Sequence, residues 1–346
     1  MVITFFYNIS LVLSIFLVLS FSSWFFIWAS IELITAMLVI LISRNLGPRS
    51  VEGLSKYFIA QAMASAFILI GIVYRFFTTN NFSILNDYDS LSFSLILLGL
   101  LIKIAAVPNP YWFVDSISGL SLTESFYIII MSKIVPMYLY IIIAGELFSS
   151  FLLWVGISSV AVGSLLIINQ TNIRKILALS SISHLGWLLL GLPCLGYQLS
   201  VLIFVIYLLM VAPLLWVNSF YNINDLFNTK RSFINPLVFF LVILSLLSLG
   251  GFPPLIGFFY KWVIFLGLLE NKSYLVCGFL IIMSLISLFA YLRLCYYLYS
   301  LYNFELKYSS DSNLMITNSL SWWTPYIITL CVTILSGGFV LLSPIF

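Results

Sequence analysis

This sequence has few charged side chains for its length. Its 346 residues include 14 Lys and Arg and 11 Asp and Glu, so 7% are charged, whereas 63% are apolar. Soluble domains average about 25% charged residues. A soluble fold could not hide so much apolar surface, so the sequence predicts a protein that crosses a membrane many times. The basic residues form no run that could follow nucleic-acid phosphates, and we expect no nucleic-acid partner.

Cysteine and histidine are also scarce. The four cysteines (Cys194, Cys277, Cys295 and Cys331) are far apart, form no CxxC pair, and are expected to be small buried apolar residues. No glycine fingerprint for a dinucleotide is visible either. The sequence therefore predicts no metal, flavin, iron–sulfur cluster or NADH site in this chain. The N-terminal MVITFFYNIS lacks the basic start of a signal peptide and the Arg-rich face of a transit peptide.

Long apolar stretches follow one another with short loops between them. They predict an all-α membrane protein, a single transmembrane domain over 1–346 with about eleven spans, at roughly 3–21, 23–43, 56–77, 91–107, 119–144, 148–168, 174–193, 197–218, 236–270, 273–302 and 320–343.

The charges in the loops predict the orientation of the chain. Three loops are basic: they hold Arg44, Arg49 and Lys56; Arg174 and Lys175; and Lys230 and Arg231. The opposite loops hold Asp87, Asp89 and Glu146 or no charge at all. With eleven spans, all basic loops fall on one face of the membrane. The positive-inside rule then places the N-terminus inside and the C-terminus outside.

Two of the spans contain helix-breaking residues. Span four runs into Val107-Pro-Asn-Pro-Tyr111, and span nine contains Gly250-Gly-Phe-Pro-Pro254. Proline lacks an N–H and clashes with the preceding turn, so we expect discontinuous helices at about Val107–Asn109 and Gly250–Pro253. These spans are five apart, and a five-span repeat must reverse its orientation. The spacing predicts two inverted five-helix repeats, about 1–146 and 147–302, followed by an additional helix at about 320–343.

Four charged residues lie inside apolar stretches: Glu32, Lys103, Lys133 and Lys261. An ionisable group at the bilayer centre costs at least ~2.5–3.5 kcal/mol. Burial disfavours the charged form of a lysine and a nearby carboxylate favours it, so a buried lysine between the two can take up and release a proton. We expect a proton relay in which Glu32 faces the interior and couples to Lys103 or Lys133. The alternative is that these charges only pair to join helices.

Two further basic residues leave alternatives open. His184 is the only histidine, and Ser180, Ser181 and Ser183 beside it could supply its hydrogen-bond partners. It is either a packed residue or, because imidazole titrates near neutral pH, a member of the relay. Arg293 lies within span ten and is expected to meet either lipid headgroups or a neighbouring subunit.

Three motifs resemble one known family. PRSVEGLSKYFIAQAMASA (48–66), NQTNIRKILALSSISHLGW (169–187) and SLGGFPPLIGFFYKW (248–262) are similar to matching stretches of the NADH dehydrogenase subunit 2 family, antiporter-like subunits of respiratory complex I. The resemblance runs in order over nearly the whole chain. Eleven spans suit the animal form of the family, which lacks three N-terminal helices. The resemblance implies that Glu32, Lys103, Lys133 and Lys261 are proton-path residues.

One segment departs from the family pattern. After the first break the family commonly reads APFHFWVPE, whereas this chain reads VPNPYWFVD over 107–115. The family's histidine is replaced by Pro110, its second proline by Val114 and its glutamate by Asp115. A role for that histidine cannot be carried over, and water or Tyr111 would have to replace it.

The resemblance implies a proton-translocating subunit of NADH:ubiquinone oxidoreductase in the mitochondrial inner membrane, with the N-terminus in the matrix and the C-terminus in the intermembrane space. Redox chemistry would take place elsewhere, with flavin and iron–sulfur clusters in other subunits. The implied partners are other membrane-arm subunits (the antiporter-like subunit 4 and the small subunit 4L), accessory subunits, and a phospholipid such as cardiolipin. The alternatives are a subunit of an Mrp-type cation/proton antiporter and a structural membrane subunit without its own proton path.

Overall fold

The computed structural model describes residues 2–43, 47–84, 88–144, 150–221 and 236–309. In these ranges the chain is helical, and the only β pairing is an isolated bridge between Ser23 and Ser83. The prediction of an all-α membrane protein is therefore confirmed. The chain divides into two compact units, unit 1 (Met1–Phe148) and unit 2 (Ser149–Phe346), which we describe one at a time.

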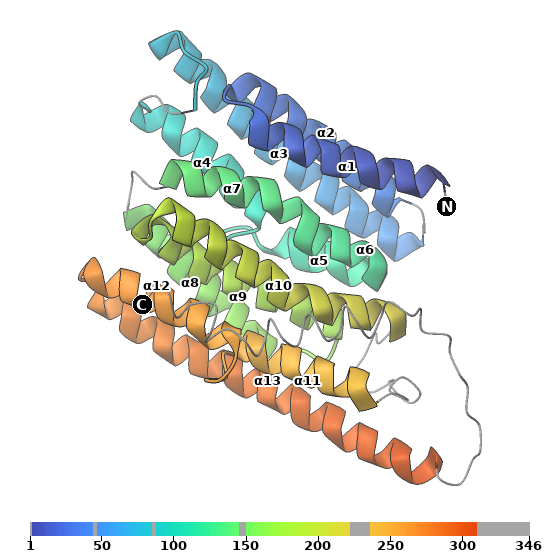
Figure 1. Cartoon of the computed structure of the whole chain (residues 1–346). Coiled ribbons are helices and arrows are strands. Elements are labelled where there is room, and N and C mark those ends of the chain that lie inside the picture. The colour runs from blue at the N-terminus through green and yellow to red at the C-terminus, as the bar shows by residue number, and fades with distance from the viewer. Residues whose placement is uncertain (1, 44–46, 85–87, 145–149, 222–235, 310–346) are drawn as a thin grey trace. The chain divides into compact units, whose positions relative to one another are not determined.

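Unit 1 is built from long helices followed by shorter ones (Figure 1). Its elements are α1 (Val2–Ser20), α2 (Trp24–Ile42), α3 (Pro48–Thr79), α4 (Ser90–Ile104), α5 (Tyr111–Gly119), α6 (Leu122–Phe126), the π-helix η1 (Tyr127–Met131) and α7 (Ser132–Ala144). Helix α3 packs against α2, α4 and α5, and α7 packs against α4. Helix α3 is therefore the central element of unit 1.

Unit 2 is arranged around one helix that is buried along most of its length. Its elements are α8 (Ser150–Ile167), α9 (Ile173–Gly191), the 3₁₀ turn η2 (Leu192–Cys194), α10 (Tyr197–Tyr221), α11 (Pro236–Gly250), α12 (Ile256–Glu270) and α13 (Tyr274–Ser309). Every residue from Ile176 to Gly191 of α9 is buried. Helix α9 contacts α8, α10 and α12, while α13 packs along α8 and α11 (Figure 1).

Six helical stretches in the described residues are long and apolar enough to cross a membrane. They are Trp24–Ile42, Pro48–Thr79, Glu124–Ile143, Ser150–Ile167, Ile173–Cys194 and Tyr274–Ser300. Phe6–Ser20, Ser90–Ile104 and Tyr197–Pro213 are shorter apolar helices. The predicted span 236–270 is divided between α11 and α12. The helix expected at 320–343 lies outside the described residues, as do Arg44, Asp87, Glu146, Lys230, Arg231 and Cys331.

The first predicted break is confirmed. Helix α4 ends at Ile104, Ala105 adopts a left-handed conformation with φ 65°, and α5 begins at Tyr111. Ala105 and Ala106 are buried, and their N–H groups donate to Ile102 and Leu101 carbonyls. With 15 residues, α4 is about 22 Å long, which is shorter than the hydrocarbon core. The sequence had not predicted α5 as a helix of its own.

The second predicted break is confirmed as well. Helix α11 ends at Gly250, Gly251 has φ 83°, and α12 begins at Ile256. Gly251 can hold this left-handed conformation because it has no Cβ. The expectation that both breaks face the interior was only partly right, since Pro108 and Asn109 in one break, and Pro253 and Pro254 in the other, are exposed. Proline has no N–H to satisfy, so burial of its backbone nitrogen is not required.

The predicted span 119–144 is not one regular helix. Ser121 caps the short helix α6, because its backbone N–H donates to Glu124 Oε2 at 3.0 Å and its hydroxyl accepts from the Glu124 N–H. The π-helix η1 then leads into α7, and Pro136 lies inside α7. A π-helix of this kind is a single wide turn, and such turns are frequent at functional sites.

Small residues allow α8 and α9 to approach closely. A Cβ added to Gly186 would lie 2.8 Å from the backbone nitrogen of Val160, and one added to Gly163 would lie 2.7 Å from that of Ser183. Contacts this short are not possible without a shift of the backbone. Close packing at small residues is the usual way in which helices associate in a membrane, where no hydrophobic effect drives them together.

We predict that Gly186→Ala lowers the stability of unit 2 by ~1–3 kcal/mol, because the methyl group would collide with the α8 backbone. The matched control is Gly278→Ala in α13, where an added Cβ meets nothing within 4 Å and alanine favours the helix. Thermal unfolding of the detergent-solubilised full chain measures both. Equal midpoints for the two variants would contradict this packing.

Candidate functional site

Lys103 is a buried lysine at the broken end of α4. Its side chain is 1% exposed, and it lies in the last turn before the break. The Nζ group donates to Gln61 Oε1 of α3 at 3.4 Å. The last carbonyls of a helix carry a partial negative charge, which favours an ammonium nearby. The break and Gln61 together thus accommodate a charge that the apolar surroundings would otherwise disfavour.

Glu32 is the acidic partner expected for this lysine. It lies on α2, its Oε1 atom is buried without a hydrogen bond, and Thr35 donates to Oε2 at 3.4 Å. Glu32 interacts electrostatically with Lys103. Among the described residues no ion pair within 4.0 Å joins the two, so the coupling acts across a gap instead of a direct contact.

Lys133 is fully enclosed in unit 1. Its side chain is 0% exposed, and its Nζ lies 4.0 Å from the ring centroid of Phe113, which is also 0% exposed. Phe113 comes from α5, the helix that follows the first break, and Lys133 from α7, just after the π-helix. The electron-rich face of an aromatic ring attracts a cation, most strongly where water is excluded.

Lys261 is held at the second break. It is 8% exposed, and its Nζ donates to the carbonyl of Gly250, the last residue of α11, at 3.1 Å. The ring of Trp187 lies 5.9 Å from Nζ, at the outer limit of a cation–π contact. Breaking the helix therefore supplies the lysine with a carbonyl that a continuous helix would have used internally.

His184 has a tyrosine as its partner. Its Nδ1 atom makes a hydrogen bond with the hydroxyl of Tyr260, which precedes Lys261 on α12. The rings of Tyr207 and Tyr260 lie 5.9 and 5.8 Å from the imidazole. The hydroxyls of Ser180, Ser181 and Ser183, which could have supplied partners for His184, donate to carbonyls one turn earlier in α9.

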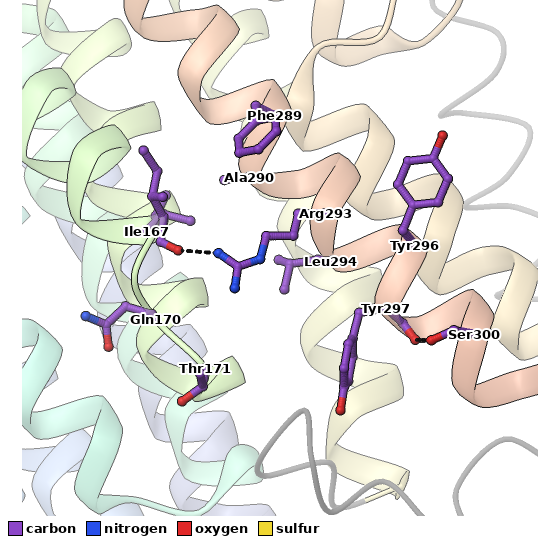
Figure 2. A pocket seen from close by; sticks show the side chains of 11 residues that line it. Ile167, Gln170, Thr171, Phe289, Ala290, Arg293, Leu294, Tyr296, Tyr297 and Ser300 are labelled. Atoms are coloured by element: carbon purple, nitrogen blue, oxygen red, sulfur yellow. Dashed lines mark hydrogen bonds between the residues drawn. The ribbon is translucent and has the colours of Figure 1, made fainter.

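Arg293, whose role the sequence left open, projects from α13 beside the end of α8 (Figure 2). The side chain is exposed, and its Nη1 donates to the carbonyl of Ile168 at 2.9 Å. It borders a cavity of about 470 Å³ between α13 and the loop that follows α8.

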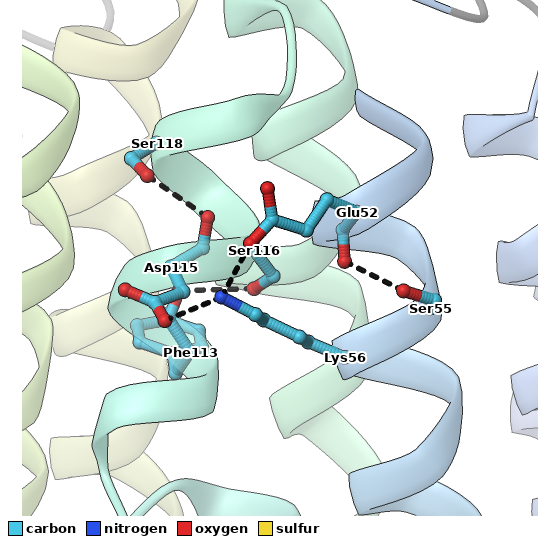
Figure 3. Close-up of polar contacts among 7 residues, drawn as sticks. All are labelled: Glu52, Ser55, Lys56, Phe113, Asp115, Ser116 and Ser118. Atoms are coloured by element: carbon cyan, nitrogen blue, oxygen red, sulfur yellow. Dashed lines mark hydrogen bonds and ion pairs between the residues drawn. The ribbon is translucent and has the colours of Figure 1, made fainter. Parts of the chain in front are cut away.

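Asp115, at the family's glutamate position, forms an ion pair with Lys56 at 2.9 Å, and Lys56 also meets Glu52 at 2.8 Å (Figure 3). The pair joins α5 to α3 at an exposed site, where such bridges stabilise little. Tyr111, proposed as a substitute for the absent histidine, is 62% exposed, and the hydrogen bond of Lys103 goes to Gln61.

The transmembrane model of the NADH:quinone oxidoreductase/Mrp antiporter family matches residues 21–287, well over half of the chain. NADH-ubiquinone oxidoreductase chain 2 of Xenopus laevis is 36% identical over 282 residues, which cover 81% of this chain and 81% of that protein. The protein of the same name from Gallus gallus is 32% identical over 291 residues, 84% of each chain. The chain belongs to the NADH-ubiquinone oxidoreductase chain 2 family.

Solved structures of complexes that contain such chains have the same fold. A chain of respiratory complex I from Thermus thermophilus with bound aureothin superposes with a TM-score of 0.79 at 24% identity, covering 85% of this chain and 70% of that one. A chain of the Mrp complex from Dietzia gives 0.73 at 19% identity, covering 82% and 58%. The fold of this chain is thus found in chains of both complexes.

Several contacts in the site were not predicted from the sequence. Gln61, Phe113 and Tyr260 each contact a residue expected in the relay, yet none carries a charge that would mark it inside an apolar span. Gln61 had the only usable signal, as an amide within the apolar part of a family motif. Across the described residues, no group of three His, Cys, Asp or Glu side chains is placed to hold a metal ion.

We predict that Phe113 and Lys133 are energetically coupled by ~1–2 kcal/mol, the size of a desolvated cation–π contact. A double-mutant cycle with Phe113→Leu, Lys133→Met and both together measures this coupling in chemical unfolding of the full chain. Combining Lys133→Met with Phe204→Leu of unit 2 gives the additive control. A coupling near zero in the first cycle would mean that the ring does not stabilise the ammonium.

Proposed function

We propose that the chain is a membrane-arm subunit of NADH:ubiquinone oxidoreductase in the mitochondrial inner membrane and that it conducts protons, driven by electron transfer in other subunits. The observation that carries the proposal is the burial of three lysines, each at a helix break or a π-turn: Lys103, Lys133 and Lys261. Intramembrane ionisable residues in such places mark ion and proton pathways. The sequence identity to NADH-ubiquinone oxidoreductase chain 2 favours a subunit of this oxidoreductase over a subunit of an Mrp-type antiporter. The partners of the chain would be the other membrane-arm subunits and the accessory subunits of the oxidoreductase.

In unit 1 the relay would consist of Glu32, Lys103 and Lys133. Glu32 sets the field at Lys103 across a gap, and one water molecule in that gap would connect their polar atoms. The Gln61 amide holds the Lys103 amine in place, and Phe113 does the same for Lys133. Each amine can accept a proton and release it without a large movement. Because Pro110 replaces the family histidine and Tyr111 is exposed, water would carry the proton beyond Lys103.

In unit 2 the relay would consist of Lys261, Tyr260 and His184. Lys261 and Tyr260 are adjacent on α12, and the Tyr260 hydroxyl meets His184. A hydroxyl can accept one proton while it donates another, so a tyrosine can connect an imidazole to a neighbouring route. This contact supports our proposal that His184 belongs to the relay and does not only pack in the core.

We also propose that the two units are inverted repeats, about 1–146 and 147–302, within an eleven-span chain. Each unit contains one broken helix with a lysine at the break, α4 with Lys103 in unit 1 and α11–α12 with Lys261 in unit 2. Broken helices at corresponding positions of two halves are typical of transport sites built from inverted repeats. The basic residues assigned to loops from the sequence support an N-terminus in the matrix, although Arg49 and Lys56 lie near the start of α3 and Arg174 and Lys175 in the first turn of α9.

We predict that Lys133→Met reduces NADH:quinone turnover and proton pumping of the assembled complex on the order of tenfold or more, the contribution of a positioned proton donor. Assembly should persist, because methionine matches the length of the lysine stem and removes a buried charge. The control is Lys272→Met, at an exposed position between α12 and α13. Normal pumping in an assembled Lys133→Met complex would favour the structural-subunit alternative.

We predict that Tyr260→Phe slows proton pumping several-fold while leaving the fold intact, since only the hydroxyl that meets His184 is lost. Tyr274→Phe, at an exposed tyrosine of α13, is the matched control. Proton uptake by the assembled complex in vesicles, measured across a pH range, tests this. If Tyr260→Phe and Tyr274→Phe pump equally at every pH, His184 has no place in the relay.

A further inference from the structure

Arg293 is a charged residue in an otherwise apolar helix, and its depth can be worked out from the helix geometry. Helix α13 begins at Tyr274, and nineteen residues at ~1.5 Å each place Arg293 about 28 Å along it. The hydrocarbon core is about 30 Å thick. If the span begins at Tyr274, the guanidinium therefore lies where hydrocarbon gives way to lipid headgroups.

A second helix gives the same depth. Helix α8 has 18 residues, about 27 Å, and ends at Ile167. The polar residues Gln170 and Thr171 follow in the loop, and Arg293 reaches this loop through the Ile168 carbonyl. The two helices pack against each other. Counted from the first residue of each helix, both spans place the cavity near the far edge of the hydrocarbon core.

The polarity of the side chains that line the cavity changes along α13. Phe289, one turn toward the membrane centre from Arg293, is 60% exposed, whereas Tyr296 and Ser300 follow one and two turns toward the loop side. Figure 2 shows Arg293 pointing from α13 toward the loop after α8, with Gln170 nearby. The cavity of about 470 Å³ is therefore apolar at one end and carries polar groups at the other.

The charge in the cavity is positive. Among the described residues that line it, none is acidic and Arg293 is the one basic side chain. A guanidinium has five N–H donors, of which one is given to Ile168, so donors remain for an anion. Arg174 and Lys175 follow Thr171 closely in sequence and add positive charge to this end of unit 2. Arginine binds phosphate groups well because its fork of donors matches their oxygens.

We propose that this cavity binds an anionic phospholipid. Its phosphate accepts hydrogen bonds from the Arg293 guanidinium, its headgroup lies beside Gln170 and Ser300, and its acyl chain runs along Phe289 toward the membrane centre. The order of apolar, cationic and hydroxyl-bearing side chains along α13 matches the order of parts in a phospholipid. The carboxylate of a neighbouring subunit, the rival partner for Arg293, would not require the exposed apolar face below it.

The test compares the reactivity of Arg293 in different lipids. The assembled complex is placed in nanodiscs of phosphatidylcholine alone, of phosphatidylcholine with phosphatidylglycerol, or of phosphatidylcholine with added inorganic phosphate. Phenylglyoxal modification of each arginine is followed by mass spectrometry. We expect phosphatidylglycerol to slow the modification of Arg293 about tenfold, because the free energy of one charge-assisted hydrogen bond changes an equilibrium constant by about this factor. Inorganic phosphate should have no such effect, and neither addition should protect Arg49, which is exposed in the first turn of α3.

A matched pair of variants gives the second measurement. After detergent purification, the Arg293→Gln complex should carry about tenfold less phosphatidylglycerol than the unmodified complex, whereas the Arg49→Gln complex should carry the same amount. Three results would overturn the proposal. Equal protection by inorganic phosphate would indicate a soluble anion site, equal protection of Arg49 would indicate a general surface effect, and an Arg293 that is unreactive in every nanodisc would indicate a covering protein subunit.

Discussion

Hydrocarbon offers no hydrogen-bond partner, so the polar groups in the spans of this chain depend on partners within the protein or on water that enters it. Serine hydroxyls meet this constraint by donating to carbonyls one turn earlier, as Ser30 and Ser180 do. The lysines cannot be satisfied in that way, because their ammonium groups need several acceptors or a negative field. Each therefore lies where the regular helix is interrupted, and the interruptions arrange the neighbouring helices around them.

The sequence was most informative where composition conflicts with a membrane environment. Charges in apolar runs identified the buried lysines, and proline and glycine identified both helix breaks, because these residues have few alternatives inside a bilayer. The sequence was least informative about which side chains contact the buried ionisable residues. Phe113 and Tyr260 are ordinary residues for an apolar span, and only the packing of α5 on the rest of unit 1, or of α12 on α9, reveals what they touch. The sequence predicts the first break but not α5, because the nine residues of this helix are fewer than the window over which apolar periodicity predicts a helix.

The family contains chains of complexes with different tasks, and the fold is common to them. Helix breaks with a buried lysine would suit any membrane protein that moves cations or protons. Close to the first break this chain departs from the family pattern, at Pro110 and Asp115. Asp115 retains a carboxylate where the family has one, and it is paired with Lys56 at the surface, away from the buried lysines.

The π-helix before α7 adds a turn that is one residue wider than an α-turn. Each extra residue in such a turn rotates everything that follows by about 100° around the helix axis, relative to an uninterrupted α-helix. The direction of Lys133 is therefore set by helical phase as well as by the identity of the residue. A one-residue deletion within Tyr127–Met131 would keep the lysine in the sequence and yet turn it away from Phe113. A lysine of a relative that aligns with Lys133 therefore points in the same direction only if that relative also has the π-helix before it.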